Sequence, residues 1–445
     1  MAWDFTTEPE FQAKLDWANG FVEDKVYKVD VLWPHDNYKP TKDLTDEQRS
    51  VIQPLKDEVR KQGLWACHLG PELGGQGYGQ LKLAMLNEIL GKSVWGPRLF
   101  GTQAPDTGNA EILAHFGTDE QKARYLEPLL SGDIVSCFSM TEPQGGADPG
   151  VFETRATRDG DDWVISGQKF FSSNARFASF FIVMAVTDPD APVLARMTMF
   201  LVPAETPGIN ILRNLAHWGE PEDAGTEALI EYDQVRVPAD AVLGAVGNAF
   251  GVAQVRLGGG RVHHAMRTVG ACQKAFDLMC RRAVSRQTRD GRLADLAVVQ
   301  EQICDSWIAL QSFRLLVLRT AWLIDKHKDY NLVRKDIAAI KVAMPKVYHD
   351  IATTAAHLHG AMGVSNEMPF MGMVTSALVM GIADGPTEVH KVTVAKQVLK
   401  DYRPDQDLFP SYHLPKLKEA ALDKYGTAIE ELKAEVAKGR APVEA

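Results

Sequence analysis

Cysteine is scarce in this sequence, and the few thiols follow no recognisable pattern. The 445 residues include five cysteines, at positions 67, 137, 272, 280 and 304. They form no Cys-x-x-Cys pair and show no spacing typical of metal ligands. We therefore expect buried thiols in a reducing compartment, and neither a disulfide framework nor a metal site.

An excess of positive charge and long apolar runs are also lacking. The formal net charge is −10, which argues against a nucleic-acid-binding protein that works by neutralising phosphates. The first residues, Met1 to Phe11, include acidic side chains and no apolar segment of the kind found in signal peptides. No uninterrupted apolar run has the length of a membrane span. These absences predict a cytoplasmic protein.

The spacing of apolar residues changes twice along the chain. Residues 1–133 show helical spacing, 134–246 show alternating spacing, and 247–402 return to long helical stretches with short connections. Short strands without intervening helices indicate an antiparallel sheet or barrel, and long helices indicate a bundle. We therefore predict an α+β fold of three domains with these bounds, followed by a charged, weakly amphipathic tail at 403–445.

The individual elements expected within these domains can be given by residue range. Strands are expected at 134–140, 164–171, 180–186, 197–202 and 228–232. Bundle helices are expected at 250–287, 293–327, 332–362 and 371–382, with a further helix starting at Pro386.

A tight elbow joins the last two predicted bundle helices. Gly385 can end the first helix, and Pro386 suits the first turn of the second. Asp384 therefore lies at a turn between two apolar helices. Its carboxylate could cap the second helix by accepting backbone N–H bonds. Alternatively, it could be a general base directed into a pocket.

Two motifs resemble the signatures of the acyl-CoA dehydrogenases. The first, CFSMTEPQGGAD at 137–148, follows the predicted change to strands. The second is HLHGAMG at 357–363, followed by Glu-Met-Pro at 367–369 and by the Asp-Gly-Pro elbow. Together they resemble the family in order and spacing over residues 5–402.

Two further stretches resemble one subgroup of that family, whose elbow reads Ala-Asp-Gly-Pro. They are APDTGN at 104–109 and LGGGRVHH at 257–264. The resemblance implies an acyl-CoA dehydrogenase-like fold with an N-terminal helical domain, a middle β domain and a C-terminal helical bundle.

The resemblance implies a reaction as well as a fold. It implies FAD-dependent α,β-dehydrogenation of an acyl-CoA thioester to the trans-2-enoyl-CoA, with electrons passed to an electron-transfer flavoprotein. The hard redox step in such enzymes belongs to the cofactor. It also implies a homodimer or homotetramer.

The catalytic base of the family, usually a glutamate at the elbow, falls on Asp384. Some members carry the base on the helix near Gly258 instead, where this sequence has three glycines and no carboxylate. We therefore expect Asp384 to be the base, with a pKa raised by desolvation. Aspartate is one methylene shorter than glutamate, so the backbone must approach the substrate more closely or the acyl chain must sit differently. Glu388 is the other nearby acid and is assigned to the cofactor side or to a surface ion pair.

The resemblance also implies which residues contact FAD. Those expected along the flavin ring are Phe138, Met140, Thr141, Phe171 and Ser173. Phe171 could equally be one position of an ordinary strand with alternating faces.

The adenosine and pyrophosphate end of FAD binds across the dimer interface in this family. Residues expected there or elsewhere on the cofactor side are Arg286, Arg289, His357, Gly360, Ala361, Gly363, Pro386 and Glu388. Arg286 suits a pyrophosphate because a guanidinium can donate two parallel hydrogen bonds to one anion. It could also be a solvent-facing helix arginine. Arg289 replaces the family's phenylalanine, and Ala297 replaces its glutamine.

Three positions are expected on the substrate side. Arg261 is expected near CoA or the active site. Ala147 replaces a serine that commonly touches substrate, and the backbone at Gly385 is expected to help polarise the thioester oxygen. His263 and His264 could suggest a metal, but adjacent histidines point to different helix faces, so no metal is expected.

Two other functions remain open at this point. One is a flavin oxidase on the same fold, such as an acyl-CoA or nitroalkane oxidase, which fast reoxidation by O₂ would reveal. The other is a non-catalytic, DNA-binding relative, which would need a basic face that the net charge disfavours.

Overall fold

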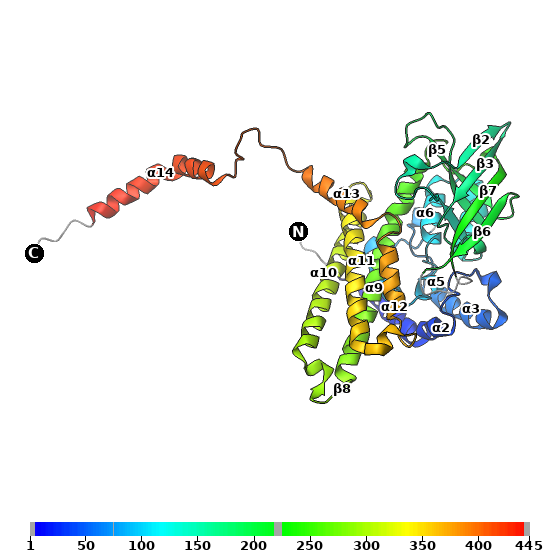
Figure 1. The fold of residues 1–445 in the computed structure, drawn as a ribbon, viewed down its shortest axis with the longest axis horizontal. Coiled ribbons are helices and arrows are strands. Elements are labelled where there is room, and N and C mark those ends of the chain that lie inside the picture. The colour runs from blue at the N-terminus through cyan, green and yellow to red at the C-terminus, as the bar shows by residue number, and fades with distance from the viewer. Residues whose placement is uncertain (1–4, 74, 218–224, 440–445) are drawn as a thin grey trace, which may run out of the picture. The chain divides into compact units, whose positions relative to one another are not determined.

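The structure is a computed structural model that describes residues 5–73, 75–217 and 225–439. The chain forms two compact units, Met1–Val394 and Ala395–Ala445. The first unit combines helices with a mixed sheet (Figure 1), which confirms the predicted α+β class.

The N-terminal part of the first unit is helical, as the apolar spacing predicts. Its helices are α1 (Pro9–Phe21), α2 (Tyr27–Leu32), α3 (Asp46–Lys61), α4 (Gly79–Leu90), α5 (Gly96–Leu99), α6 (Asp106–Phe116), α7 (Asp119–Gln121) and α8 (Glu127–Ser131). Helix α3 begins with a capping box, in which the Thr45 hydroxyl accepts from the Gln48 amide and the Gln48 side chain accepts from Thr45. Helix α6 is buried over most of its length, so its polar side chains face other parts of the protein rather than water.

The middle of the chain forms one seven-stranded sheet. Its strands are β1 (Ser136–Ser139), β2 (Arg155–Asp159), β3 (Asp162–Lys169), β4 (Phe180–Val186), β5 (Met197–Pro203), β6 (Ile209–Leu215) and β7 (Glu227–Pro238). They pair in the order β1-β4-β2-β3-β7-β6, and β5 lies off this path and pairs antiparallel with β4 over its whole length. Every residue of β4 is buried, as expected for a strand covered on both faces.

The sheet differs from the prediction in two respects. It is mixed and not antiparallel throughout, because β4 runs parallel to both β1 and β2. Strand β4 can run parallel to β1 because the β2–β3 hairpin lies between them in sequence. In addition, β2 and β6 were not predicted, because most of their side chains are exposed and give no apolar alternation.

The chain from Ala249 to Leu399 is a bundle of long helices. They are α9 (Ala249–Ser285), α10 (Ala297–His327), α11 (Arg334–His359), α12 (Phe370–Met380) and α13 (Thr387–Leu399). Helices α9, α10 and α11 lie side by side (Figure 1) and share a buried apolar core with α1, α3 and α4. A short hairpin of β8 (Gln287–Thr288) and β9 (Gly291–Arg292) connects α9 to α10.

One bundle helix is unusually apolar. By length and composition, α10 could cross a membrane, although no uninterrupted apolar run of that length is expected from the sequence. It packs against α4, α9 and α11. A buried core helix meets the same criterion, so α10 by itself is weak support for a membrane span.

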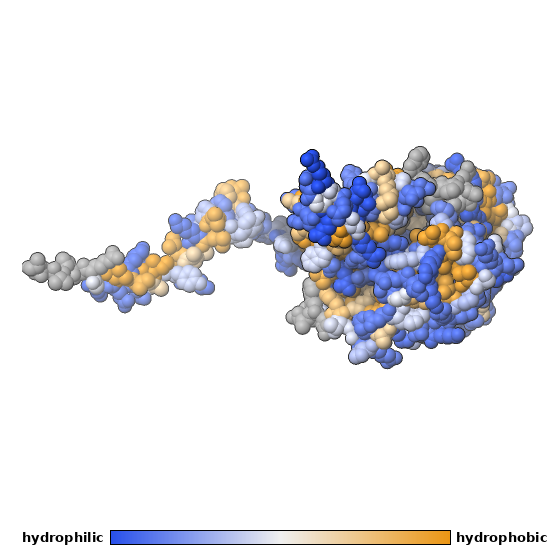
Figure 2. All heavy atoms as spheres, turned by 90° about the horizontal axis from the view of Figure 1, so that it is seen from below, coloured by the Kyte–Doolittle hydropathy of each residue, from blue (hydrophilic) through white to orange (hydrophobic). Residues whose placement is uncertain are grey.

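The tail, predicted as a surface helix or a partly ordered segment, contains helix α14 (Leu414–Lys438). None of its residues is buried. Figure 2 shows apolar and hydrophilic side chains exposed together along it. Its exposed large hydrophobic side chains include Leu417, Tyr425 and Leu432.

Candidate active site

The elbow between α12 and α13 has an unusual backbone. Asp384 has a φ of 55° and Gly385 a φ of 109°. Positive φ is uncommon for a residue with a side chain, although aspartate tolerates it better than most. The Arg261 Nε donates to the Asp384 carbonyl at 2.9 Å, and His390 Nε2 lies 3.3 Å from the same oxygen. The turn is thus held from α9 and α13 in a conformation that directs Asp384 inward.

The Asp384 carboxylate faces α9 and not the N-terminus of the helix that follows it. Its Oδ1 lies 3.7 Å from an Arg256 guanidinium nitrogen, and its Oδ2 lies 3.6 Å from His264 Nε2. The side chain is only 14% exposed. This geometry favours a buried functional carboxylate over a helix cap.

Arg256 is the residue to which most of the site connects. Its Nε donates to Asn109 Oδ1 at 2.8 Å, and its guanidinium lies 4.0 Å from the centre of the Phe138 ring. A Cβ at Gly108 would lie 3.0 Å from the Arg256 side chain. Residues of α6, β1 and the elbow therefore all meet this one cation.

A buried chain of hydrogen bonds continues from Arg256 into the sheet. Asn109 Nδ2 donates to the Ser136 hydroxyl at 2.8 Å. The Ser136 hydroxyl and its backbone amide both donate to Asp106 Oδ1, at 2.6 and 2.8 Å. Because each of these buried groups has a partner, the chain fixes α6 against β1 and orients Arg256.

The three consecutive glycines of α9 each make room for a different side chain. A Cβ at Gly258 would lie 3.0 Å from the Tyr330 ring, and one at Gly259 would lie 2.3 Å from Glu111 Oε2. A Cβ at Gly260 would lie 2.9 Å from Asp384 Oδ2. The glycines thus leave space for the elbow carboxylate and for a second buried carboxyl group.

The predicted direction of the Asp384 pKa shift is wrong. Burial alone would raise this pKa, but nearby cations outweigh burial and hold it below its usual value. Burial lowers the pKa of His264 to about 3, so His264 is neutral at neutral pH and cannot be the decisive charge. His264 is the first of the groups that lower the Asp384 pKa, followed by Arg256, Arg261 and Lys341, and it is the last three that carry positive charge at neutral pH.

The second carboxyl group, Glu111, is 9% exposed. Burial raises its pKa to about 7, against opposing contributions from the Tyr330 hydroxyl and Arg256. Tyr330 Oη donates to Glu111 Oε1 at 3.0 Å.

The predicted flavin-side residues gather at one edge of the sheet. Phe138 in β1 and Ser173 are bridge partners, which places two segments that are distant in sequence next to each other. The Ser173 hydroxyl donates to Glu227 at 2.8 Å. Phe171 has a φ of 51° and is 52% exposed, so it is neither a core position nor part of a regular strand.

A buried ion pair holds the segment that contains Met140 and Thr141. Lys169 Nζ donates to Glu142 Oε1 and to the Met140 carbonyl, each at 2.8 Å. Glu142 also accepts from the backbone amides of Glu153 and Thr154. The Phe170 amide donates to the Thr141 carbonyl at 2.9 Å.

The remaining residues predicted to bind FAD or substrate lie outside the group of side chains around Arg256. Arg286 and Arg289 are exposed beyond the far end of α9. At about 1.5 Å per helical residue, Arg286 lies roughly 40 Å along the axis from Gly260. His357, Gly360 and Ala361 are exposed at the end of α11, whereas Gly363 is buried. Ala147 and Glu388 are exposed, and Pro386 is half-buried before α13.

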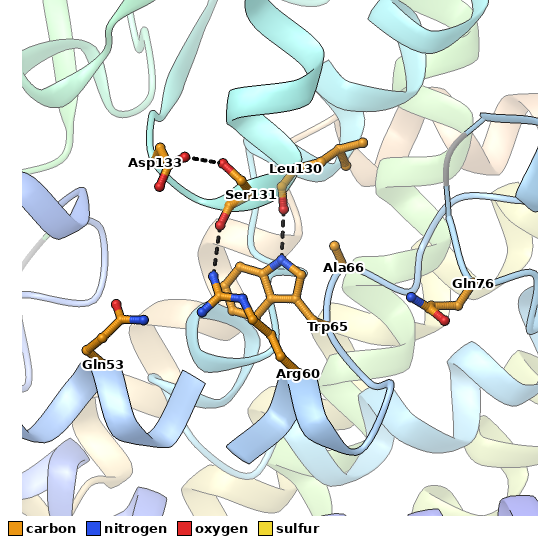
Figure 3. Close-up of a pocket in the computed structure, with 8 residues that line it drawn as sticks. All are labelled: Gln53, Arg60, Trp65, Ala66, Gln76, Leu130, Ser131 and Asp133. Atoms are coloured by element: carbon orange, nitrogen blue, oxygen red, sulfur yellow. Dashed lines mark hydrogen bonds between the residues drawn. The ribbon is translucent and has the colours of Figure 1, made fainter. Parts of the chain in front are cut away.

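A cavity of about 570 Å³ is lined by Arg60, Trp65 and Leu130 among others, and it contains none of the predicted site residues. Figure 3 shows Arg60 stacked on Trp65, whose indole N–H donates to the Leu130 carbonyl at 2.8 Å. Among the described residues, no group of three potential metal ligands was found.

Among the cluster residues that were not predicted from the sequence are Arg256, Glu111, Tyr330 and Lys341. They come from α9, α6, the α10–α11 connection and α11, and no local pattern links them. The available signal was Arg256, which precedes Gly259 and Gly260 by three and four residues and so shares their helix face.

Comparisons with known proteins identify the family. The acyl-CoA dehydrogenase N-terminal, middle and C-terminal domain models match residues 33–133, 137–231 and 247–399. The chain therefore belongs to the acyl-CoA dehydrogenase family. This confirms the predicted family and enzyme class, and it confirms the FAD cofactor at the level of the family.

Individual relatives support the same assignment. The chain is 38% identical over 400 residues to the probable acyl-CoA dehydrogenase FadE2 of Mycobacterium tuberculosis, covering 89% of this chain and 93% of the relative. It is 39% identical to human acyl-CoA dehydrogenase family member 11 over 79% of this chain, but it spans 45% of that protein. The solved structure of a putative acyl-CoA dehydrogenase from Mycobacterium abscessus is 36% identical, with a TM-score of 0.82 over 89% of this chain and all of that one.

Proposed function

We propose that this protein is an FAD-dependent acyl-CoA dehydrogenase in which Asp384 removes the α-proton of the acyl-CoA. The product would be the trans-2-enoyl-CoA, the electron acceptor an electron-transfer flavoprotein, and the compartment the cytoplasm. The observation that carries the proposal is the inward-facing, ionised carboxylate of Asp384, held at a strained elbow beside Arg256.

The groups around Asp384 suit proton abstraction. A carboxylate kept ionised at neutral pH is ready to accept a proton without first losing one. Arg261 fixes the Asp384 carbonyl rather than its carboxylate, so the base is oriented without its oxygens being consumed. The cations that keep the carboxylate ionised also make it a weak base in the free protein, and a bound thioester that excludes water would increase its basicity.

The predicted cofactor contacts are compatible with FAD. The bound cofactor would accept the hydride from the β-carbon, which carries both electrons of the oxidation. Phe138, Thr141 and Ser173 bring an aromatic face, a hydroxyl and backbone amides to one edge of the sheet, which suits a planar ring that both stacks and accepts hydrogen bonds.

The separation within one chain favours a cofactor shared between subunits. Arg286 lies roughly 40 Å along α9 from Gly260, which is farther than one FAD molecule reaches from the elbow. We therefore propose a homodimer or homotetramer in which Arg286 and the 357–363 loop complete the cofactor site with residues of another subunit.

Anaerobic flavin reduction tests the function directly. The FAD-loaded protein is mixed with acyl-CoAs of varied length, branching and γ-substitution, and bleaching of the flavin absorbance is followed. Rapid bleaching by at least one thioester, with slow reoxidation in air, is the expected result. Fast reoxidation by O₂ would favour an oxidase, and no bleaching by any thioester would contradict the proposal.

A further inference from the structure

Arg256 interacts electrostatically with two buried carboxyl groups, those of Asp384 and Glu111. Gly259 and Gly260 follow it by three and four residues on α9, so they lie on its side of the helix. Gly259 is in contact with Glu111, and Gly260 is in contact with Asp384. The Arg256 guanidinium is thus placed where it can interact with both carboxyl groups at once.

Glu111 is held firmly in this position, although the proposed reaction gives it no role. Tyr330 Oη donates to its Oε1 at 3.0 Å, and the Tyr330 ring packs at the glycine one residue before Gly259. A buried carboxyl group lowers stability if it loses either its hydrogen-bond donor or its neighbouring cation. Such an arrangement calls for an explanation beyond packing.

We propose that Glu111 is a positioning residue that sets how strongly Asp384 holds a proton, because the two carboxyl groups share the Arg256 guanidinium. The inference rests on the proposed function of Asp384 as the base.

The physical reason is the single positive charge of Arg256. When Glu111 is neutral, the field of Arg256 acts mainly on Asp384 and weakens it as a base. When Glu111 is ionised, it offsets part of that field, and Asp384 becomes a stronger base. The effect is large only because the groups are buried, where the effective dielectric constant is far below that of water.

The other charged groups near the two carboxyls must be considered as well. Those facing Asp384 are Arg256, Arg261 and His264 from α9, Lys341 from α11 and His390 from α13. Those facing Arg256 besides the two carboxyls are Asp106 and Cys137. Of these groups, Lys341 also titrates near neutrality, because burial lowers its pKa to about 8. Its deprotonation would strengthen Asp384 in the same direction, but at higher pH than Glu111.

The substitution Glu111→Gln removes the charge and keeps the shape and the acceptor for Tyr330. In the parent protein, the rate constant for flavin reduction by acyl-CoA should rise as the pH passes about 7, where Glu111 ionises. In Glu111→Gln this step should disappear, and the rate above it should fall by roughly threefold to tenfold, the size expected for a weakened general base.

Two further variants separate this effect from structural damage. Tyr330→Phe removes the donor that lowers the pKa of Glu111, so it should move the step to higher pH without abolishing it. Glu88→Gln is the control, since Glu88 is a partly buried carboxylate paired with Arg314 away from the site. It should leave the pH profile unchanged.

A measurement that does not depend on activity is the stability of the protein as a function of pH. A carboxyl group whose pKa is raised on folding contributes stability that is present below its unfolded pKa and lost as pH rises through the folded value. The parent should therefore lose stability relative to Glu111→Gln between about pH 4.5 and about 7, measured by urea unfolding.

The outcomes are distinguishable. A Glu111→Gln enzyme that reduces its flavin with the parent's pH step would overturn the inference, whatever becomes of the proposed function. If Glu111→Gln does not fold, an unshifted step in Tyr330→Phe would overturn it. If the parent itself is not reduced by any acyl-CoA, the proposed function fails, and the inference falls with it because Asp384 is then not the base; the unfolding data would still report the ionisation of Glu111.

Discussion

At the scale of single residues, the site depends on where one carboxylate points. Asp384 occupies a left-handed backbone conformation that most side chains avoid, and its carbonyl is anchored by Arg261. Strained backbone that the surrounding structure fixes is common at functional sites. The strain at Asp384 is consistent with a role in chemistry.

The first prediction concerns Asp384 itself. Asp384→Asn keeps the shape but cannot accept a proton, so flavin reduction should slow by roughly 10²-fold or more while FAD content stays near that of the parent. Asp384→Glu should be impaired but faster than Asp384→Asn, because Gly260 leaves little room beside the carboxylate. Stopped-flow absorbance measures both. If Asp384→Asn is reduced at close to the parent rate, the base is elsewhere, and Glu388 is the next acid to test.

The second prediction concerns the glycine that faces the base. In Gly260→Ala the new Cβ would lie 2.9 Å from Asp384 Oδ2, so the carboxylate must move. A displacement of about 1 Å can cost about 100-fold in rate, and we expect a loss of 10- to 100-fold in flavin reduction with FAD retained. Gly20→Ala is the control, because a Cβ there meets nothing within 4 Å. A parental rate in Gly260→Ala would show that the site tolerates a shifted carboxylate.

At the scale of secondary structure, a buried ion pair connects the sheet to the segment expected to face the flavin. Lys169, at the end of β3, and Glu142 have side-chain exposures of 0% and 2%. Breaking a buried pair by removing one partner leaves the other charge uncompensated, which is costly.

The third prediction follows from this pair. Lys169→Met should lower the free energy of unfolding by about 3–5 kcal/mol, measured in urea. Lys346→Met is the matched control, because the Lys346–Asp350 pair is largely exposed and should contribute within about 1 kcal/mol. Similar losses in the two variants would mean that the Lys169–Glu142 pair adds no more than a surface pair.

At the scale of the whole molecule, the proposed FAD contacts near the elbow and the one at Arg286 lie too far apart for a single FAD molecule bound to one chain. The fourth prediction is that Arg286→Ala lowers FAD occupancy, measured as flavin absorbance per chain, while the same substitution at Arg281, an exposed arginine in the last turns of α9, does not. Arg289→Phe should also change occupancy. A stable monomer that retains FAD as tightly as the oligomer would contradict the shared site.

The fifth prediction concerns the tail. The C-terminal domain model ends at residue 399, and the Mycobacterium abscessus structure is covered completely by 89% of this chain. All proposed site residues precede this point. A protein that ends at Arg403 should therefore keep its FAD and its rate of flavin reduction within about twofold of the full chain. A larger loss would assign the tail a part in the enzyme.

The sequence by itself determined the features that are encoded locally. Apolar spacing predicted the long helices α9 to α12 and the buried strands β4 and β5 close to their observed bounds, because buried elements carry a strong period. It missed β2 and β6, since exposed strands carry none. Contiguous motifs identified the family and placed Asp384 at an elbow.

Only the tertiary structure decided what surrounds that elbow. Arg256 and Arg261 of α9 and Lys341 of α11 lie far from Asp384 in sequence, and their positive charges acting across space reversed the expected direction of the Asp384 pKa shift. Electrostatic energies depend on distances between side chains that are far apart in sequence, and no local pattern contains those distances.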